Sequence, residues 1–306
     1  MSQVQQSSVY WADATLDALG PGPAWGYRPG GPPATEPTAL VAMALACGSR
    51  PRSGRAAAYW LADTQNPDGS LGPAPGHSRP GWPTALAVAA WFALKPLLDL
   101  ESDQRRIGAA SAEGVDWLLR SAGRSEPRVS WMGHDSTLVG WPWVDGTHSW
   151  LEPTAWGLLA LRASGQGDHP RAREAARLLL DRRLPDGGWN YGNTQVLGRD
   201  LRPQVAPTGL ALLALLGEPE AQGRLTASLD YLHAAIARRC APISLALAVL
   251  GLAAQGQPPA DALARLAEAS EHERLGQARS PQLALLALAG LRCRPGSEFP
   301  QRASPH

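Results

Sequence analysis

The stretch APTGLALLALL, residues 206–216, decides the fold class of this chain of 306 residues. Its proline suits the first position of a helix, where the missing N–H costs nothing and φ is already helical. The run that follows Thr208 is apolar on every side, so the helix that it predicts must be buried all round. Such a helix belongs inside a larger helical assembly.

The same start signal, a proline and then a short, mostly polar residue before an Ala/Leu-rich run, occurs six times. The prolines are Pro37, Pro83, Pro153, Pro207, Pro242 and Pro281. Each apolar run is preceded by an amphipathic segment such as 171–180, whose apolar residues recur at spacings of three and four. Further amphipathic segments are predicted near 8–19, 54–65, 108–121, 220–238 and 259–270.

Six apolar helices that alternate with six amphipathic ones can bury every apolar face if the apolar set forms an inner ring and the other set surrounds it. We therefore predict an all-α fold, an (α/α)6 toroid of six outer/inner helix pairs. One domain is expected over residues 1–306, with its core at about 8–292 and a flexible tail at 293–306. The extra length falls mainly in a Trp-rich insertion at about 121–150, and long insertions often carry function.

Composition and charge limit the partners and the compartment. The 28 basic and 27 acidic residues leave a net charge of +1 without any charge block, so no nucleic acid is expected as a partner. The three cysteines, Cys47, Cys240 and Cys293, show no paired spacing and favour a reducing compartment. The polar N-terminus and the lack of a long apolar run predict a cytoplasmic protein, with peripheral membrane contact left open. The oligomeric state is not predicted.

Turn sequences carry a resemblance to a known superfamily. The segment RAAAYWLADTQNPDGSL, residues 55–71, resembles the QW repeat of squalene and oxidosqualene cyclases. The Pro-Asp-Gly turn recurs at 184–192, and the Ala-Pro-Thr helix start is similar to those of protein prenyltransferase β subunits. The chain thus resembles the terpenoid cyclase and protein prenyltransferase toroid superfamily over about 8–292. Two positions depart from the repeat, because Leu71 replaces its tryptophan and Arg183 replaces its glutamine.

The resemblance implies a position for a proton donor. Cyclases of this kind carry Asp-x-Asp-Asp-Thr-Ala at the start of an inner helix, and the middle aspartate is the acid. Alignment on Thr154 places Glu152 at the donor position, and Glu36 repeats that position before Thr38, so both are candidate catalytic residues. The supporting acids are missing in both places. A carboxylate at a helix N-terminus is stabilised in its charged form by about 0.3–1 kcal/mol, so only desolvation would keep it protonated. The alternative role is a first-turn glutamate that satisfies helix N–H groups.

Tryptophan is the remaining signal, since the chain holds 12 Trp against 2 Phe. Aromatic faces bind cations and apolar chains, and buried tryptophans equally lock helical repeats together. Both roles stay open for the tryptophans of the insertion, whereas packing between repeats is the expected role of Trp60, Trp117 and Trp189. The candidate ligand-binding residues are Asp145, His148, Trp141, Trp143, Trp150, Trp82, Trp189 and Tyr191.

No metal or cofactor is expected. The sequence lacks Asp-Asp-x-x-Asp, and Thr147 stands where the zinc-binding segment of protein prenyltransferases has a cysteine after Asp145. His77, His134 and His148 match no zinc spacing.

Three functions remain. The first is a binding or accessory toroid with a small apolar or isoprenoid ligand and no acid chemistry. The second is a small terpene cyclase that uses Glu152 as its acid. The third, more distant, is a glycan-active (α/α)6 enzyme, which would need paired carboxylates. The sequence does not decide whether the chain is an enzyme.

Overall fold

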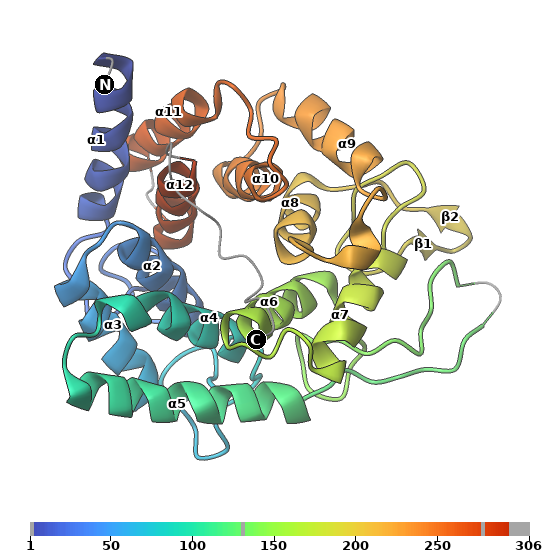
Figure 1. Ribbon diagram of the computed structural model, residues 1–306, viewed down its shortest axis with the longest axis horizontal. Coiled ribbons are helices and arrows are strands. Elements are labelled where there is room, and N and C mark those ends of the chain that lie inside the picture. Colours follow the sequence, from blue (N-terminus) through green and yellow to red (C-terminus); the bar gives the residue numbers. More distant parts are fainter. Residues whose placement is uncertain (1–2, 130–131, 277–278, 294–306) are drawn as a thin grey trace. The chain divides into compact units, whose positions relative to one another are not determined.

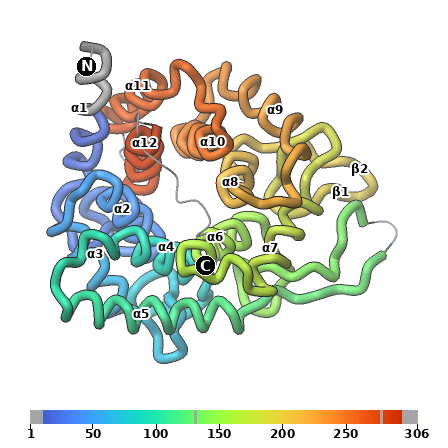
Figure 2. The backbone as a smooth tube through the Cα atoms, viewed as in Figure 1, coloured from blue at the N-terminus to red at the C-terminus, as the bar shows by residue number. Residues whose placement is uncertain are grey.

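The computed structural model describes residues 3–129, 132–276 and 279–293, with the backbone alone for 3–10 (Figures 1 and 2). The secondary-structure elements of these residues are helices joined by loops, apart from one two-stranded hairpin, β1 (Gln195–Val196) and β2 (Arg199–Asp200). The all-α class is therefore confirmed. The predicted tail beyond residue 293 and Trp131 of the insertion lie outside the described residues.

A helix begins at or near each of the six predicted proline signals, and its side chains are mostly buried. Pro242 and Pro281 stand within the first two positions of their helices, as the sequence predicted. For the other four the predicted position was wrong, because Pro37, Pro153 and Pro207 stand third in their helices and Pro83 directly precedes its helix. All still lie where a backbone N–H has no partner within the helix. These apolar helices are α2 (Thr35–Cys47), α4 (Thr84–Leu94), α6 (Leu151–Ala163), α8 (Val205–Ala214), α10 (Pro242–Ala254) and α12 (Ser280–Arg292).

The amphipathic helices precede them in the chain, as predicted. They are α1 (Gln3–Ala18), α3 (Pro51–Asp63), α5 (Glu101–Arg120), α7 (Pro170–Asp181), α9 (Thr226–Ile236) and α11 (Ala262–Leu275). Three predicted starts were wrong. Helix α1 starts at Gln3, five residues before the predicted 8. Helix α5 starts seven residues before the predicted 108, with Glu101 and Asp103 in its first turn. Helix α9 starts at Thr226, because the short 3-10 helix η2 (Pro219–Ala221) precedes it; a second such helix, η1 (Lys95–Leu97), follows α4.

The helices pack into two compact units. In unit 1, which comprises the described residues up to Trp117 and from Ala260 on, α2 packs against α12, α4 and α3, while α11 and α1 cover α12. In unit 2, residues 118–259, α8 packs against both α10 and α6. The contact of α8 with α10 requires glycine, because a Cβ on Gly209 would lie 2.3 Å from the carbonyl oxygen of Leu247.

A hydrogen bond that we call the threonine latch fixes the start of four apolar helices. In each case the threonine after the proline is fully buried, and its Oγ1 accepts a backbone N–H from the loop that precedes the helix. The latch explains why threonine recurs there, since a buried N–H without a partner costs about 1–3 kcal/mol. The bonds are Trp25 to Thr38 (3.0 Å), Leu71 to Thr84 (2.8 Å), Trp141 to Thr154 (3.1 Å) and Trp189 to Thr208 (2.9 Å).

Three of the latched residues are tryptophans, and each indole N–H donates to a carbonyl of an amphipathic helix or of the residue after it. The acceptors are Leu19 for Trp25 (2.9 Å), Leu118 for Trp141 (3.1 Å) and Leu179 for Trp189 (2.6 Å). At the fourth latch, where Leu71 replaces the tryptophan, the side-chain amide of Gln65 donates to the carbonyls of Gly69 and Ala110, both at 2.9 Å. The latched tryptophans thus tie neighbouring helices together.

Candidate functional site

The start of α6 in unit 2 carries a set of rings that we call the aromatic group: His148, Trp150 and Tyr191. Trp150 is the extended residue before α6, and its N–H donates to the carbonyl of Trp141 at 3.1 Å. The His148 ring lies 4.6 Å from the Trp150 ring at an interplanar angle of 39°. The carbonyl of Tyr191 accepts the N–H of Leu151 at 2.9 Å, so its backbone lies beside the first residue of α6.

The aromatic group is fixed but accessible. A Cβ on Gly192 would lie 3.1 Å from Cε3 of Trp150, so the 191–192 backbone packs closely on the indole. Trp150 is half-buried, His148 is exposed, and Tyr191 is 50% exposed. Rings held in place by the backbone at the surface lose little conformational entropy when they bind a ligand.

The ends of the insertion are held together by main-chain bonds. The N–H of Arg124 donates to the carbonyl of Thr147 at 2.8 Å, and Arg124 forms a parallel bridge with His148. The Ser149 hydroxyl accepts the N–H of Gly140 at 2.8 Å. Asp145 lies exposed in the turn between these bonds, where Gly146 has a positive φ of 75°. His148 therefore lies at the end of a loop whose two ends are joined by hydrogen bonds.

A buried arginine lies behind the aromatic group. Arg182, which follows α7, is buried and donates from Nη1 to the carbonyl of Gly192 at 2.6 Å. Its Nε lies 3.6 Å from the Asp181 carboxylate, which also accepts the N–H of Asp135 at 2.9 Å. Burial lowers the pKa of Arg182 to about 10, with Asp181 and Asp135 acting in the opposite direction. Arg182 thus stays charged and joins α7 to the segment that carries Tyr191.

Burial and the positive charge of Arg182 lower the pKa of two histidines, His134 and His148. His134 is buried, with Nδ1 3.3 Å from the Thr194 hydroxyl. Burial first, then the charges of Arg182 and His148, lower the pKa of His134 to about 4, although Asp135 raises it. Burial, Arg182 and Arg124 lower the pKa of His148 also, against a smaller opposing effect of Glu126. Both imidazoles are therefore neutral near pH 7.

The candidate acid Glu152 lies half-buried in the first turn of α6, directly after the aromatic group in the chain. Trp150 and Pro153 flank it where the resemblance would require acids. Trp143, half-buried, lies within the insertion between Trp141 and the turn of Asp145. The structure therefore places the predicted residues Glu152, Trp150, His148 and Tyr191 at the same end of α6.

The second candidate acid, Glu36, lies half-buried in the first turn of α2 in unit 1. The hydroxyl of Tyr27 donates to its Oε2 at 2.5 Å. Burial raises the pKa of Glu36, and the hydrogen bond from Tyr27 opposes that rise. Desolvation, the condition that a proton donor at a helix start requires, is thus present at Glu36.

The aromatic group does not include three other predicted ligand-binding residues, which are Trp141 and Trp189 of unit 2 and Trp82 of unit 1. Trp141 is 3% exposed and Trp189 is 0% exposed, and both make the indole bonds given above. The guanidinium of Arg171 also lies 4.6 Å from the Trp141 ring centre. Trp82, half-buried, stands directly before Pro83 in unit 1. The contacts of Trp141 favour the packing role that the sequence left open, and those of Trp189 agree with the packing role that its repeat predicted.

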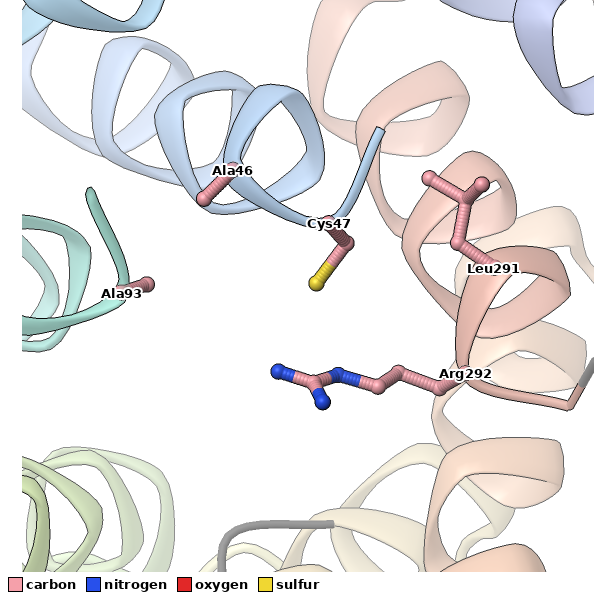
Figure 3. A pocket seen from close by; sticks show the side chains of 5 residues that line it. All are labelled: Ala46, Cys47, Ala93, Leu291 and Arg292. Atoms are coloured by element: carbon pink, nitrogen blue, oxygen red, sulfur yellow. The ribbon is translucent and has the colours of Figure 1, made fainter. Parts of the chain in front are cut away.

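Unit 1 also contains a cavity of about 200 Å³ at the C-terminal ends of α2, α4 and α12. Figure 3 shows the Cys47 thiol and the Arg292 guanidinium extending into it, beside Ala46, Ala93 and Leu291. Burial raises the pKa of Cys47, although Arg292 opposes the rise. A thiol that stays protonated is a poor nucleophile, and none of the predicted site residues lines this cavity.

Among the described residues, no group of three or more His, Cys, Asp or Glu is placed to hold a metal ion. Within the same part of the chain, no helix has the length and apolar character needed to cross a bilayer. None of the three cysteines, which all lie in the described part of the chain, forms a disulfide bond.

Comparison with known proteins supports the fold alone. No family model and no curated protein matches the chain. Among solved structures it is similar to one titled "Crystal structure of a protein from Actinoplanes", with a TM-score of 0.59 and 18% sequence identity. That match covers 94% of this chain and 98% of the other. At such an identity a shared architecture does not transfer a function.

Proposed function

We propose that this chain is an α/α-toroid protein that binds an apolar, isoprenoid-type ligand through the aromatic group at the start of α6. The observation that carries the proposal is the contact of the exposed His148 ring with the half-buried Trp150 ring, beside the backbone of the exposed Tyr191. The proposal includes the ring of six helix pairs. Its support is the alternation of apolar and amphipathic helices and the repetition of the threonine latch in four of them.

The character of the rings favours an apolar ligand. His148 is neutral near pH 7, so the group offers aromatic faces and no added positive charge. Trp150 and Pro153 stand beside Glu152 at the two positions where a cyclase motif has aspartates. Binding without proton transfer is therefore the function that this end of α6 supports best.

Titration with a linear polyprenol tests the proposal through saturable quenching of tryptophan fluorescence. Tyr191→Ala and His148→Ala keep every tryptophan and should weaken binding by about fivefold to thirtyfold, the equivalent of about 1–2 kcal/mol of apolar contact. Leu100→Ala is the control, because Leu100 in unit 1 and Tyr191 in unit 2 are both 50% exposed. Equal affinity in all three variants would assign the aromatic group to packing.

A second candidate function, a small isoprenoid cyclase, is favoured by the environment of Glu36. Its carboxyl group is desolvated at a helix start, with a phenol at hydrogen-bond distance that can hold its position. A product screen by mass spectrometry with linear isoprenoids separates the two functions. A cyclised product from the wild type that is absent with Glu36→Gln but present with Glu152→Gln would identify Glu36 as the acid. If no chain length gives a product, the binding function is the better account.

A further inference from the structure

The hairpin β1–β2 ends in a turn whose first central residue is an exposed leucine. Val196 pairs with Arg199, which leaves Leu197 and Gly198 as the two turn residues. Their φ values, 51° and 72°, are both positive, the signature of a type I′ turn. Asn-Gly is the usual sequence of such a turn, because a branched side chain is strained at positive φ. A leucine at this position is unfavourable for the backbone.

The hairpin is firmly built at its base. The N–H of Leu201 donates to the carbonyl of Thr194 at 2.8 Å, and the amide of Gln195 donates to the Asp200 carboxylate at 2.7 Å. A Cβ on Gly133 would lie 2.7 Å from the Thr194 hydroxyl, so the insertion packs directly on this base. Figure 1 shows the hairpin projecting from the rest of unit 2. The tip is therefore supported by the hydrogen bonds and the close packing at the base of the hairpin.

Burial does not account for the leucine. Leu197 is 98% exposed, and its neighbour Val196 is 47% exposed. An apolar side chain that strains its backbone and contributes almost nothing to the core indicates a role outside the fold. Arg199 and Arg202, both exposed, stand on the strand side that follows the tip, with Asp200 between them.

We propose that the β1–β2 tip is a membrane-contact element that inserts Leu197 and Val196 into the interface of a bilayer containing anionic lipids. Each strand has only two residues, which is too short to extend a partner's sheet, and one projecting tip is much smaller than a protein interface. A bilayer interface suits a narrow apolar tip. Arginines beside such a tip can extend their charged ends to lipid phosphates, and Arg199 and Arg202 are both exposed beside this one.

Co-sedimentation with vesicles tests the proposal, with phosphatidylcholine alone and with phosphatidylcholine mixed with phosphatidylglycerol. The wild type should partition to the mixed vesicles more than to the neutral ones. Leu197→Asn should lower the partition coefficient at least about tenfold, because the apolar insertion is lost. The same change supplies Asn-Gly to a type I′ turn, so the melting temperature should stay constant or rise. Loss of binding would then not come from misfolding.

Leu275→Asn is the matched control, because Leu275 is 82% exposed at the end of α11 in unit 1. It should leave vesicle binding unchanged. The proposal is overturned if the wild type does not sediment with either vesicle, or if Leu197→Asn binds as well as the wild type. Gel filtration tests the alternative that the tip contacts a second copy of the chain. The membrane proposal is also overturned if the wild type is a dimer that binds no vesicle and Leu197→Asn is a monomer. These measurements need no isoprenoid ligand, so they are independent of the proposed function.

Discussion

Replacement of Thr208 by valine tests the threonine latch directly. The Oγ1 of Thr208 accepts the N–H of Trp189 at 2.9 Å, and both residues are 0% exposed. Valine nearly keeps the shape of threonine and removes only the hydroxyl, so no large cavity forms. The carbonyl of Trp189 keeps the N–H of Gln204 at 2.8 Å, which leaves one N–H without a partner. A buried N–H of this kind costs about 1–3 kcal/mol.

We therefore expect Thr208→Val to lower the free energy of unfolding by about 2 kcal/mol and the melting temperature by about 4–8 °C. Urea unfolding followed by circular dichroism and by tryptophan fluorescence measures both effects. Thr208→Ser should recover most of the loss, because the hydroxyl is restored. Thr226→Val, at an exposed position that starts α9, is the control for the residue change itself. The reasoning is refuted if Thr208→Val is no less stable than Thr226→Val.

Two further predictions concern stability. The pKa of His134 falls from 6.5 to about 4 on folding, so the neutral ring stabilises the fold above about pH 6.5 and this contribution is lost as the pH falls toward 4. His134→Gln should therefore reduce the dependence of the free energy of unfolding on pH between about 4 and 6.5, measured by denaturation at several pH values. An unchanged slope would contradict this prediction. Gly209→Ala should cost several kcal/mol or prevent folding, because its Cβ meets backbone of α10, whereas Gly108→Ala, with nothing within 4 Å of the new Cβ in α5, should be neutral or gain about 1 kcal/mol in thermal unfolding.

The helices were predictable because each carries its own local signal. A proline before an apolar run marks a helix start by the backbone alone, and the apolar spacing of 171–180 identifies a half-buried helix without knowledge of its neighbours. The hairpin at 195–200 was not predicted, because the turn residues Leu197 and Gly198 lack the usual Asn-Gly signal. The alternation of apolar and amphipathic helices also predicts a ring of helix pairs. Such an arrangement depends on contacts between distant helices, which local sequence patterns do not establish.

The candidate site was predictable only in part, because burial of a polar side chain is set by residues distant in the sequence. His148 and Trp150 stood out as unusual residues in a long insertion. Arg182 gave no signal, since an arginine after an amphipathic helix normally faces solvent. In the structure it is buried and donates to the carbonyl of Gly192, which is distant from it in the sequence pattern. For Trp141 packing and binding had equal weight in the sequence, and only the hydrogen bond of its indole N–H to Leu118 favours packing. For Trp189 the repeat pattern already predicted packing, and its indole N–H donates to Leu179.

Comparison among the repeats of this one chain separates positions that the fold requires from positions that are free to serve function. The residue after the helix-start proline is threonine in four repeats, and in each of them it forms the latch. The residue before the same proline is Glu36, Trp82, Glu152 or Ala206. Since an alanine at 206 accompanies a complete latch at Thr208, the latch does not need a carboxylate before the proline. The latch therefore does not explain the glutamates at the starts of α2 and α6. If a ligand contacts some repeats and not others, Glu36 and Glu152 are the residues at this position that we expect it to contact.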